Sequence, residues 1–407
     1  MYQRYLQKHL LQALADTPVV FLQGPRQSGK STLVRELLRG KHAARYVTLD
    51  DPAPLEAASS DPDAFVADLG GPVALDEVQR APGLFRALKA SVDRDRRPGR
   101  FLLTGSAQAL LLPRLAEMLA GRMEVVTLWP LSQAEIEGNS ENFVERLFGG
   151  KLGGGSGAPK DLWGRVAAGG FPEALGRRDP VRRGAWFDSY VSTILQRDVL
   201  ELSRIDDLSL LPRLLRLAAA RAGGLLNVSE FSRSLAAPLT TLKRHLALFE
   251  ATFLVQTVPA WSTNRGKRLV KSPKLYLSDS GLLAHLLGWN GKPDMLSRET
   301  GMILENFVAM ELLKLSGWAP FAVTLHHYRT FAGREVDFVL EGPGGNLVGV
   351  EVKAASAVGP DDFKGLRELQ ADAGERFHRG VVLYTGKDQV SFGKGLNAVP
   401  MGALWAS

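Results

Sequence analysis

A glycine-rich segment near the N-terminus has the residue types needed to hold a phosphate chain. Residues 24–31, Gly-Pro-Arg-Gln-Ser-Gly-Lys-Ser, fit the pattern G-x-x-x-x-G-K-[ST], with a strand-like run before them and a helical pattern after them. Glycines let backbone N–H groups turn toward the β-phosphate, the Lys30 ammonium reaches the β- and γ-phosphates, and the Ser31 hydroxyl binds Mg²⁺. The alternative is a glycine-containing turn that fits by chance. The predicted contacts to ATP and Mg²⁺ are Gly24, Pro25, Arg26, Gln27, Ser28, Gly29, Lys30, Ser31 and Thr32.

An acidic pair follows later in the chain, where Asp76 and Glu77 close the apolar run Val73-Ala-Leu75. In nucleotide-hydrolysing sites the first carboxylate of such a pair orients the water shell of the metal ion, and the second polarises the attacking water. We therefore expect Asp76 to act at the metal and Glu77 to favour hydrolysis. The alternative is an acidic pair that only caps the end of a strand.

Two further positions are candidates for contact with the γ-phosphate. Phe101-Leu-Leu-Thr-Gly-Ser106 predicts a buried strand whose polar end, Thr104 or Ser106, is placed to sense that phosphate. The alternative is a hydroxyl that only satisfies the strand end. Arg122 is expected to reach the γ-phosphate in cis or from a neighbouring subunit, because a fixed guanidinium neutralises charge in the transition state. Otherwise it is an ordinary surface arginine.

Near the C-terminus, carboxylates and a lysine recur at the spacing of a metal site. Asp337 lies in one predicted strand, and Glu351 and Lys353 end the next. Strand side chains alternate, so Glu351 and Lys353 share a face that Asp337 opposes across the hairpin. Two carboxylates there hold Mg²⁺ while Lys353 positions a water, as phosphodiester hydrolysis requires. Glu305, on the preceding predicted helix, completes the cluster.

Basic residues concentrate between Pro238 and Tyr276, where seven lysines and arginines stand against one acid, Glu250. Clustered bases bind phosphates and release counterions, so the stretch predicts DNA binding. The alternative is a solvated basic face used for contacts with a protein partner. The residues predicted to bind DNA are Thr241, Lys243, Arg244, Arg265, Lys267 and Arg268; Lys271 and Lys274 are the other two bases of the stretch.

The elements that position these residues fall into segments. From Thr17 to Leu128, short apolar runs alternate with helical patterns, which favours a parallel sheet covered on both faces. The predicted elements are a strand at 18–22, a helix at 30–38, and strands at 46–50, 73–75 and 100–104. The glycine-rich segment 149–159 predicts a surface loop or linker.

The second half of the chain predicts two further regions. Helical patterns at 162–204, 208–221, 228–235 and 238–253 precede extended runs at 254–260 and 268–277. Three helices followed by a hairpin is the order of a winged helix-turn-helix. A helix at 299–315, strands at 322–330, 335–341 and 347–353, a helix at 361–373 and a strand at 380–384 predict a separate α/β domain.

The composition narrows the class of protein to which the chain can belong. A chain of 407 residues predicts two or three domains. The absence of cysteine excludes disulfides, thiol nucleophiles and zinc or iron–sulfur sites built on thiolates. No apolar run reaches the roughly 18 residues of a membrane helix, and no signal peptide is recognisable, so we expect a cytoplasmic protein without membrane contact. The net charge of +7 favours an anionic partner.

These motifs together resemble the AAA-type ATPases of bacteria and archaea that carry a C-terminal domain of unknown function. The resemblance rests on G-P-R-Q-S-G-K-S-T-L at 24–33, L-D-E-V-Q at 75–79, L-L-T-G-S at 102–106, L-A-G-R at 119–122 and L-W-P-L-S at 128–132. Residues 169–173, 196–199, 277–282 and 301–306 agree as well. The resemblance implies an ATPase fused to a winged-helix and nuclease-like region.

The C-terminal constellation resembles the PD-(D/E)XK nuclease superfamily, whose site combines a helix carboxylate, a strand aspartate and an E-x-K strand. The leading Pro-Asp is replaced here by Glu335-Val-Asp337. Related domains keep such residues while acting only as binding modules, so both an active metal-dependent DNA endonuclease and a silent fold remain open.

The predicted fold is α/β, with a P-loop ATPase parallel sheet, a winged helix-turn-helix and a PD-(D/E)XK-like α/β domain. The predicted boundaries are 1–135 for the ATPase domain, 136–206 for a helical lid or linker, 207–278 for the winged helix and 279–407 for the nuclease-like domain. The leading hypothesis is an ATP-hydrolysing, DNA-associated switch or motor that acts alone or as a homo-oligomer. The alternative is a regulatory ATPase that gates a protein partner, with a silent nuclease-like domain.

Overall fold

The structure is a computed structural model that describes residues 2–108, 119–150, 152, 161–199, 209–264, 271–294 and 297–405. Contacts divide the chain into two units. The N-terminal unit comprises Gln3–Pro130 and Phe249–Leu254, and the larger unit comprises Leu131–Leu248, Val255–Ser407 and Met1–Tyr2. The sequence-based boundary after residue 135 falls inside helix α7 (Gln133–Glu137) of the larger unit. The predicted division into four domains stays a prediction.

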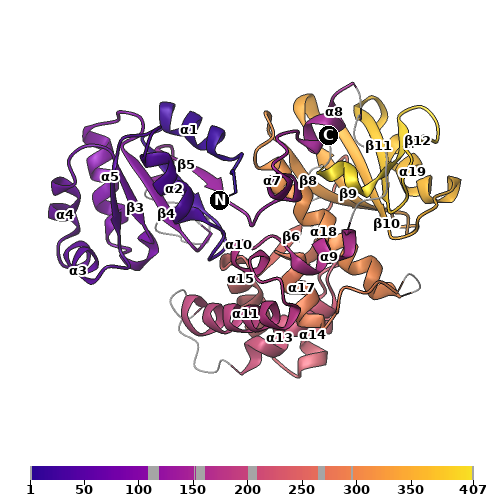
Figure 1. Ribbon diagram of the computed structural model, residues 1–407, viewed down its shortest axis with the longest axis horizontal. Coiled ribbons are helices and arrows are strands. Elements are labelled where there is room, and N and C mark those ends of the chain that lie inside the picture. The colour runs from indigo at the N-terminus through magenta and orange to yellow at the C-terminus, as the bar shows by residue number, and fades with distance from the viewer. Residues whose placement is uncertain are drawn as a thin grey trace. The chain divides into compact units, whose positions relative to one another are not determined.

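A five-stranded parallel sheet forms the centre of the N-terminal unit (Figure 1). Its strands are β1 (Val19–Gln23), β2 (Arg45–Thr48), β3 (Val73–Asp76), β4 (Phe101–Gly105) and β5 (Met123–Thr127). They lie in the order β2-β3-β4-β1-β5, and every adjacent pair is parallel. Strands β1, β3 and β4 are buried along almost their whole length, as expected for a parallel sheet covered on both faces. The predicted α/β fold of this region is confirmed.

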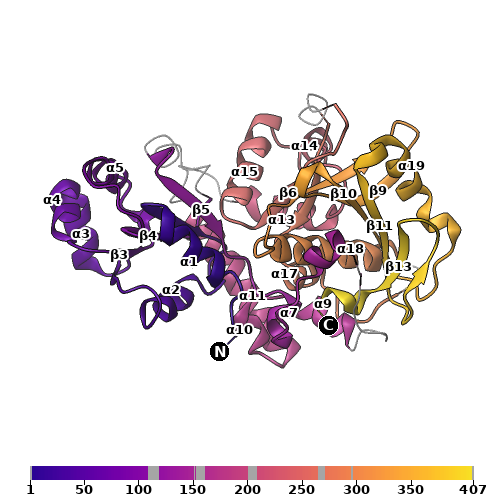
Figure 2. The same ribbon diagram turned by 90° about the horizontal axis from the view of Figure 1, so that it is seen from above.

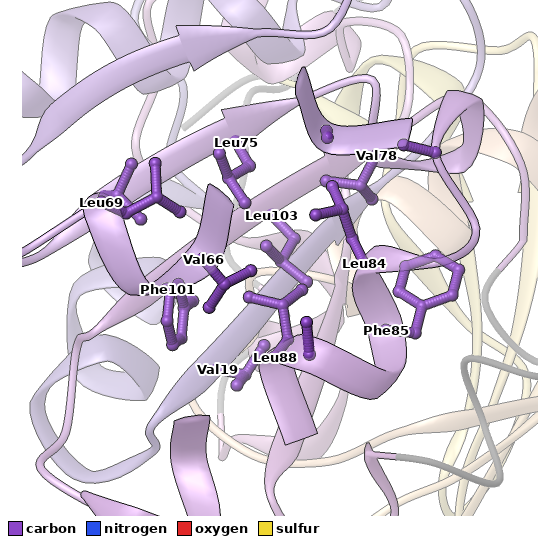
Figure 3. Close-up of a cluster of buried hydrophobic side chains, with 14 of the residues drawn as sticks. Val19, Val66, Leu69, Leu75, Val78, Leu84, Phe85, Leu88, Phe101 and Leu103 are labelled. Carbon is purple, nitrogen blue, oxygen red and sulfur yellow. The ribbon is translucent and has the colours of Figure 1, made fainter. Parts of the chain in front are cut away.

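Helices pack on this sheet through side chains of alternate strand positions. They are α1 (Gln7–Asp16), α2 (Lys30–Leu38), α3 (Pro52–Ser60), α4 (Pro62–Asp68) and α5 (Leu84–Arg94), with a short 3-10 turn at Val78–Arg80. Figures 1 and 2 show α3, α4 and α5 together on one side of the sheet. Figure 3 shows the core beneath them, in which side chains of α4 and α5 meet those of the strands. Its labelled members are Val19, Val66, Leu69, Leu75, Val78, Leu84, Phe85, Leu88, Phe101 and Leu103.

The larger unit begins with helices. They are α7, α8 (Phe143–Phe148), α9 (Leu162–Ala168), α10 (Pro172–Leu175), α11 (Pro180–Thr193), a π-helical turn (Ile194–Asp198), α13 (Leu210–Ala220), α14 (Val228–Leu235) and α15 (Leu239–Ala251). Strands β6 (Val255–Val258) and β7 (Lys274–Leu277) then form an antiparallel pair, and α17 (Ser280–Leu287) follows. The order of three helices and a two-stranded sheet agrees with the sequence-based prediction. The glycine-rich segment 149–159 lies mostly outside the described residues.

A six-stranded mixed sheet forms the C-terminal part of the larger unit. Helix α18 (Arg298–Ser316) precedes β8 (Thr324–Arg329), β9 (Glu335–Glu341) and β10 (Leu347–Lys353), and α19 (Lys364–Ala373) precedes β11 (Phe377–Tyr384), β12 (Val390–Ser391) and β13 (Leu396–Pro400). The order is β12-β13-β11-β10-β9-β8, with antiparallel pairs at both edges and parallel pairs in the centre. Helices α18 and α19 lie on opposite faces (Figure 2). In the part of the chain that the structure describes, no helix is long and apolar enough to cross a bilayer.

Candidate functional site

The loop between β1 and α2 has the backbone of a phosphate cradle. Gly24 has a φ of +153°, and a Cβ at this position would lie 2.1 Å from the Leu128 carbonyl oxygen. Gly29 caps α2 in the left-handed region with a φ of 97°, which turns the chain sharply into the helix. The loop is tied down from outside, because Arg4 donates to the Ser28 carbonyl oxygen at 2.8 Å and to the Trp129 carbonyl oxygen at 2.6 Å.

The close approach at Gly24 predicts a large effect of one methyl group. We expect Gly24→Ala to lower the free energy of unfolding by roughly 1–3 kcal/mol or more, because the loop must shift away from Leu128. Urea denaturation measures this loss. Gly40→Ala is the matched control, since an added Cβ there meets nothing within 4 Å. Equal stability of the two variants contradicts the prediction.

Two polar side chains of this loop, Lys30 and Ser28, are buried. The Lys30 ammonium folds back onto the carbonyl oxygens of Gly24 and Pro25, at 2.9 Å each. The Ser28 hydroxyl is fully buried, and its oxygen has no hydrogen-bond partner among the described residues. A buried, unsatisfied polar atom in a native site calls for an explanation such as an absent ligand. The other predicted contacts, Arg26, Gln27 and Thr32, are partly or fully exposed beside it.

Three hydroxyl groups converge on the Asp76 carboxylate at the end of β3. Ser31 donates to Oδ2 at 2.9 Å, Tyr46 donates to the same oxygen at 2.5 Å, and Thr104 donates to Oδ1. The structure therefore brings together Ser31, Asp76 and Thr104, three of the predicted site residues. Burial and the hydrogen bond to Asp76 raise the pKa of Tyr46 to about 12. Sequence reasoning missed Tyr46, because its position in β2 carries no motif.

Removing the Tyr46 hydroxyl tests how strongly it holds Asp76. We expect Tyr46→Phe to lower the free energy of unfolding by about 1.5–3 kcal/mol, the range for hydrogen bonds to a charged group. In an Asp76→Asn background the same change should cost less, since the charged acceptor is gone. A double-mutant cycle in urea measures this coupling, and a coupling energy near zero contradicts the assignment.

Glu77 lies directly beyond β3, next to the polar end of β4. Its backbone has a φ of 59°, in the left-handed region where non-glycine residues are uncommon. Its amide donates to the Thr104 hydroxyl at 3.3 Å, and its carboxylate accepts from the Gln79 side chain and, at 3.5 Å, from Ser106. The Gln79 amide also donates to the Ser106 hydroxyl at 3.2 Å. Gln79 thus joins Ser106 to the Glu77 carboxylate, a role that sequence reasoning missed.

Arg122 does not join this group. Met123, the first residue of β5, pairs with Val19, the first residue of β1, whereas the phosphate loop follows the last residue of β1, Gln23. Because the strands are parallel, Arg122 and the loop lie at opposite ends of the sheet, and the Arg122 guanidinium bonds to Asp93 at 2.6 Å. The predicted role of Arg122 in cis is therefore wrong. A role in a neighbouring subunit stays a prediction.

The C-terminal cluster forms across β9 and β10 as the sequence predicted. The Val352 amide donates to Asp337 Oδ2 at 3.0 Å, and the Asp337 amide donates to Glu351 Oε2 at 3.3 Å. Lys353 Nζ lies 3.0 Å from Glu351 Oε1, so these two side chains do share a face. Glu305 reaches the cluster from α18 through a lysine, because Lys274 Nζ lies 3.0 Å from Glu305 Oε1 and 3.3 Å from Asp337 Oδ1.

Lys274 corrects the predicted basic surface. Its side chain is only 3% exposed, and it also lies 2.6 Å from Glu335 Oε1. Burial alone lowers the pKa of Lys274, but the charges of Glu305, Asp337 and Glu335 outweigh burial and raise that pKa. Burial and the charge of Asp337 raise the pKa of Glu305 to about 7 and that of Glu351 to about 8. Lys274 is an internal counter-ion and not part of a DNA-binding face.

The six residues predicted to bind DNA divide into two groups. Lys243 and Arg244 are exposed on α15, and Thr241 is partly exposed one turn earlier. Arg265, Lys267 and Arg268 lie outside the described residues. Lys271, at the start of the segment that leads into β7, donates to the Arg329 carbonyl oxygen at 3.2 Å. Among the described bases of this stretch, Lys243 and Arg244 are therefore exposed and Lys274 is buried.

The motifs at 169–173, 277–282 and 301–306 contact one another in the larger unit. Asp279 accepts hydrogen bonds from the Gly170 amide at 2.8 Å and the Gly281 amide at 2.9 Å. Asn306 accepts from the Leu277 amide at 2.8 Å and donates to the Leu277 carbonyl oxygen at 3.0 Å. The Asp279 side chain therefore bonds the backbone at 170 and 281, the Asn306 side chain bonds the backbone at 277, and both have a structural role.

Comparison with known families agrees with the geometry of the N-terminal unit. Residues 16–137 match the family described as "AAA domain". Residues 159–293 match a "Domain of unknown function (DUF8612)", and residues 300–404 match a "Domain of unknown function (DUF4143)". Together with the parallel sheet and its phosphate loop, the first match makes this unit an AAA-type P-loop ATPase domain.

The whole chain also has relatives of similar length. It is 34% identical over 396 residues to the uncharacterized protein Rv2008c of Mycobacterium tuberculosis and to the uncharacterized protein Mb2031c of Mycobacterium bovis. Each alignment covers 96% of this chain and 82% of the relative. The chain belongs to the same family as these two mycobacterial proteins. Among solved structures, it resembles a Walker-type ATPase of Pyrococcus abyssi at 16% identity and a TM-score of 0.43, over 70% of this chain and 96% of that one.

Proposed function

We propose that this protein is an ATP-hydrolysing, DNA-associated switch. The observation that carries the ATPase part is the group of Lys30, Ser31, Asp76, Glu77 and Thr104 at the carboxyl ends of three adjacent strands. Ligands of open parallel sheets bind at this edge, in the crevice where strand connections diverge. The unsatisfied Ser28 hydroxyl is consistent with a ligand in the loop.

Each residue of this group has a task in ATP hydrolysis. Backbone amides of the loop and the Lys30 ammonium bind the β- and γ-phosphates, for which Lys30 exchanges its two carbonyl partners. The Ser31 hydroxyl would bind Mg²⁺ and the Asp76 carboxylate would orient its water shell, and the ion would neutralise developing phosphate charge. Glu77 accepts a proton from the attacking water, and Gln79 and Ser106 hold its carboxylate in place.

The DNA part of the proposal is supported by the exposed bases of α15. Three helices and an antiparallel strand pair precede the C-terminal sheet, and Lys243 and Arg244 project from the third helix. Lysines and arginines that contact phosphates release counterions, so DNA affinity must fall steeply with salt. Each lost contact reduces the slope of log K against log salt by roughly 0.9.

Salt titration of DNA binding tests this part. We expect the variant Lys243→Ala/Arg244→Ala to bind DNA more weakly and to reduce the slope by roughly 2, at 0.9 per phosphate contact. Arg39→Ala, which removes an exposed arginine of the N-terminal unit, is the control and should leave the slope unchanged. A flat salt response of the unsubstituted chain contradicts DNA association. It favours the second candidate function, a regulatory ATPase that gates a protein partner.

The burial of Lys274 is the observation that keeps this second candidate open, because it removes one base from the proposed DNA surface. The ATPase rate with single-stranded, duplex and branched DNA separates the two functions further. Stimulation by one DNA form supports the switch and identifies its substrate class. An unchanged rate with all three favours the regulatory ATPase.

A further inference from the structure

The C-terminal carboxylate cluster already contains a cation. The Lys274 ammonium lies 3.0 Å from Glu305, 2.6 Å from Glu335 and 3.3 Å from Asp337, and these carboxylates come from α18 and β9. Two of them, Glu305 and Asp337, are residues that the sequence predicted to bind Mg²⁺. The ammonium therefore lies between the predicted metal ligands.

The backbone fixes the position of this ammonium. Lys274 pairs with Val258 of β6 on one side and forms a bridge with Leu225 on the other. The residues on either side of it are bonded as well, since Leu226 donates to the Pro273 carbonyl oxygen at 2.8 Å and Leu275 donates to the carbonyl oxygen of the 223–224 turn at 3.0 Å. Lys274 therefore enters the cluster from a paired strand and not from a loop.

The carboxylates of the cluster are satisfied without a metal ion. Glu305 also accepts from the Tyr276 hydroxyl at 2.7 Å, Asp337 accepts from the Val352 amide at 3.0 Å, and Glu351 accepts from the Asp337 amide at 3.3 Å. Among the described residues, none of these carboxylates has a buried oxygen without a hydrogen-bond partner. Each of these carboxylates accepts at least one hydrogen bond from a protein donor.

We propose that the Lys274 ammonium is the resident cation of the C-terminal carboxylate site and takes the place of a divalent metal ion. Mg²⁺ and Ca²⁺ require carboxylate oxygens at about 2.0–2.6 Å, and an ammonium at the centre of the same oxygens repels a second cation. Within the described ranges, no group of three or more acidic or histidine side chains is arranged to hold a metal ion. The predicted nuclease residues then act as a joint between α18, the C-terminal sheet and β7.

Access does not explain the exclusion of metal. A cavity of about 740 Å³ between the 220–225 turn, α14 and the first turns of α18 reaches Glu305. A hydrated ion fits such a volume, so the lysine and not a closed wall keeps metal out. This inference is independent of the ATPase activity, because no residue of the phosphate loop takes part in it.

Titration with Mn²⁺ in the absence of nucleotide tests the proposal on the full-length chain. Five proteins are compared: the unsubstituted chain, Asp337→Asn, Lys274→Met, Lys274→Met/Asp337→Asn and the control Lys271→Met. Only binding that Asp337→Asn removes is counted, which sets aside ions held at the phosphate loop. We expect one additional Mn²⁺ in Lys274→Met and none in the unsubstituted chain or in Lys271→Met.

Two results overturn the proposal. The first is Mn²⁺ binding to the unsubstituted chain that Asp337→Asn abolishes. The second is a folded Lys274→Met variant, judged by circular dichroism, that binds no more Mn²⁺ than the unsubstituted chain. If Lys274→Met is unfolded in metal-free buffer, recovery of its circular dichroism with Mn²⁺ but not with Na⁺ supports the proposal, and no recovery counts against it.

Discussion

Lys30→Ala is expected to abolish ATP turnover, with a loss of at least about 100-fold, because it removes the charge that meets the β- and γ-phosphates. Lys30 is the first residue of α2, is 4% exposed and donates to the carbonyl oxygens of Gly24 and Pro25. Its ammonium is therefore positioned beside the cradle before nucleotide arrives. Steady-state ATP hydrolysis measures the loss.

A matched lysine separates this effect from a general loss of charge. Lys41 is an exposed residue of the same unit, bonded to the Gln7 side chain at 2.9 Å, and Lys41→Ala should keep the rate of the unsubstituted chain. Circular dichroism confirms that both variants are folded. Unchanged turnover in Lys30→Ala removes the assignment of the phosphate loop.

Lys274→Met is expected to lower the free energy of unfolding in metal-free buffer by about 3–5 kcal/mol, the cost of breaking a buried ion pair by removing one partner. Methionine has a similar length but leaves Glu305, Glu335 and Asp337 without their shared cation. The cost arises from mutual repulsion and incomplete solvation of these carboxylates. Urea denaturation of the whole chain measures this loss of stability.

Lys271→Met is the control for this second prediction, because Lys271 is partly exposed and contacts the Arg329 carbonyl oxygen and the Phe331 ring but no carboxylate of the cluster. We expect it to change stability by about 0.5 kcal/mol or less, as for most surface substitutions. Similar stabilities of the two variants mean that the lysine–carboxylate cluster contributes little. The structural joint inferred here then lacks its energetic basis.

Local sequence signals predicted several helices and strands with the correct first and last residues. The predicted helices at 30–38 and 228–235 coincide with α2 and α14, and the predicted strands at 335–341 and 347–353 coincide with β9 and β10. Their ends are set by local chemistry: Gly29 turns the chain into α2, and the Asn227 side chain accepts from the Glu230 amide at the start of α14. Such signals depend on neighbours in sequence, so a single chain reveals them.

Errors arose where the answer depends on distant segments. Charge counting placed Lys274 on a basic surface. Composition does not show that the backbone of Lys274 pairs on both sides, or that carboxylates surround its ammonium group. Arg122 is the last residue of a motif, yet the parallel register of β1 and β5 places it at the end of the sheet opposite the phosphate loop. Tyr46 escaped notice because its contact with Asp76 depends on β2 and β3 lying side by side.

The phosphate loop was recognisable because its requirements are local. Glycines with positive φ, a lysine at the start of a helix and a following hydroxyl act within a few residues of one another. The C-terminal cluster was recognisable in part, since two adjacent strands bring Asp337, Glu351 and Lys353 together. The cation of this cluster, Lys274, was not recognisable from the sequence, because it lies in β7, more than sixty residues before Asp337 of β9.

A crystal structure with a non-hydrolysable ATP analogue and Mg²⁺ tests the central claim most directly. The account predicts that the triphosphate lies in the loop at residues 24–31, that Lys30 leaves the Gly24 and Pro25 carbonyl oxygens for the phosphates, and that Ser31 turns from Asp76 toward the metal. A nucleotide bound elsewhere, or a loop in which Lys30 keeps both carbonyl partners, contradicts it.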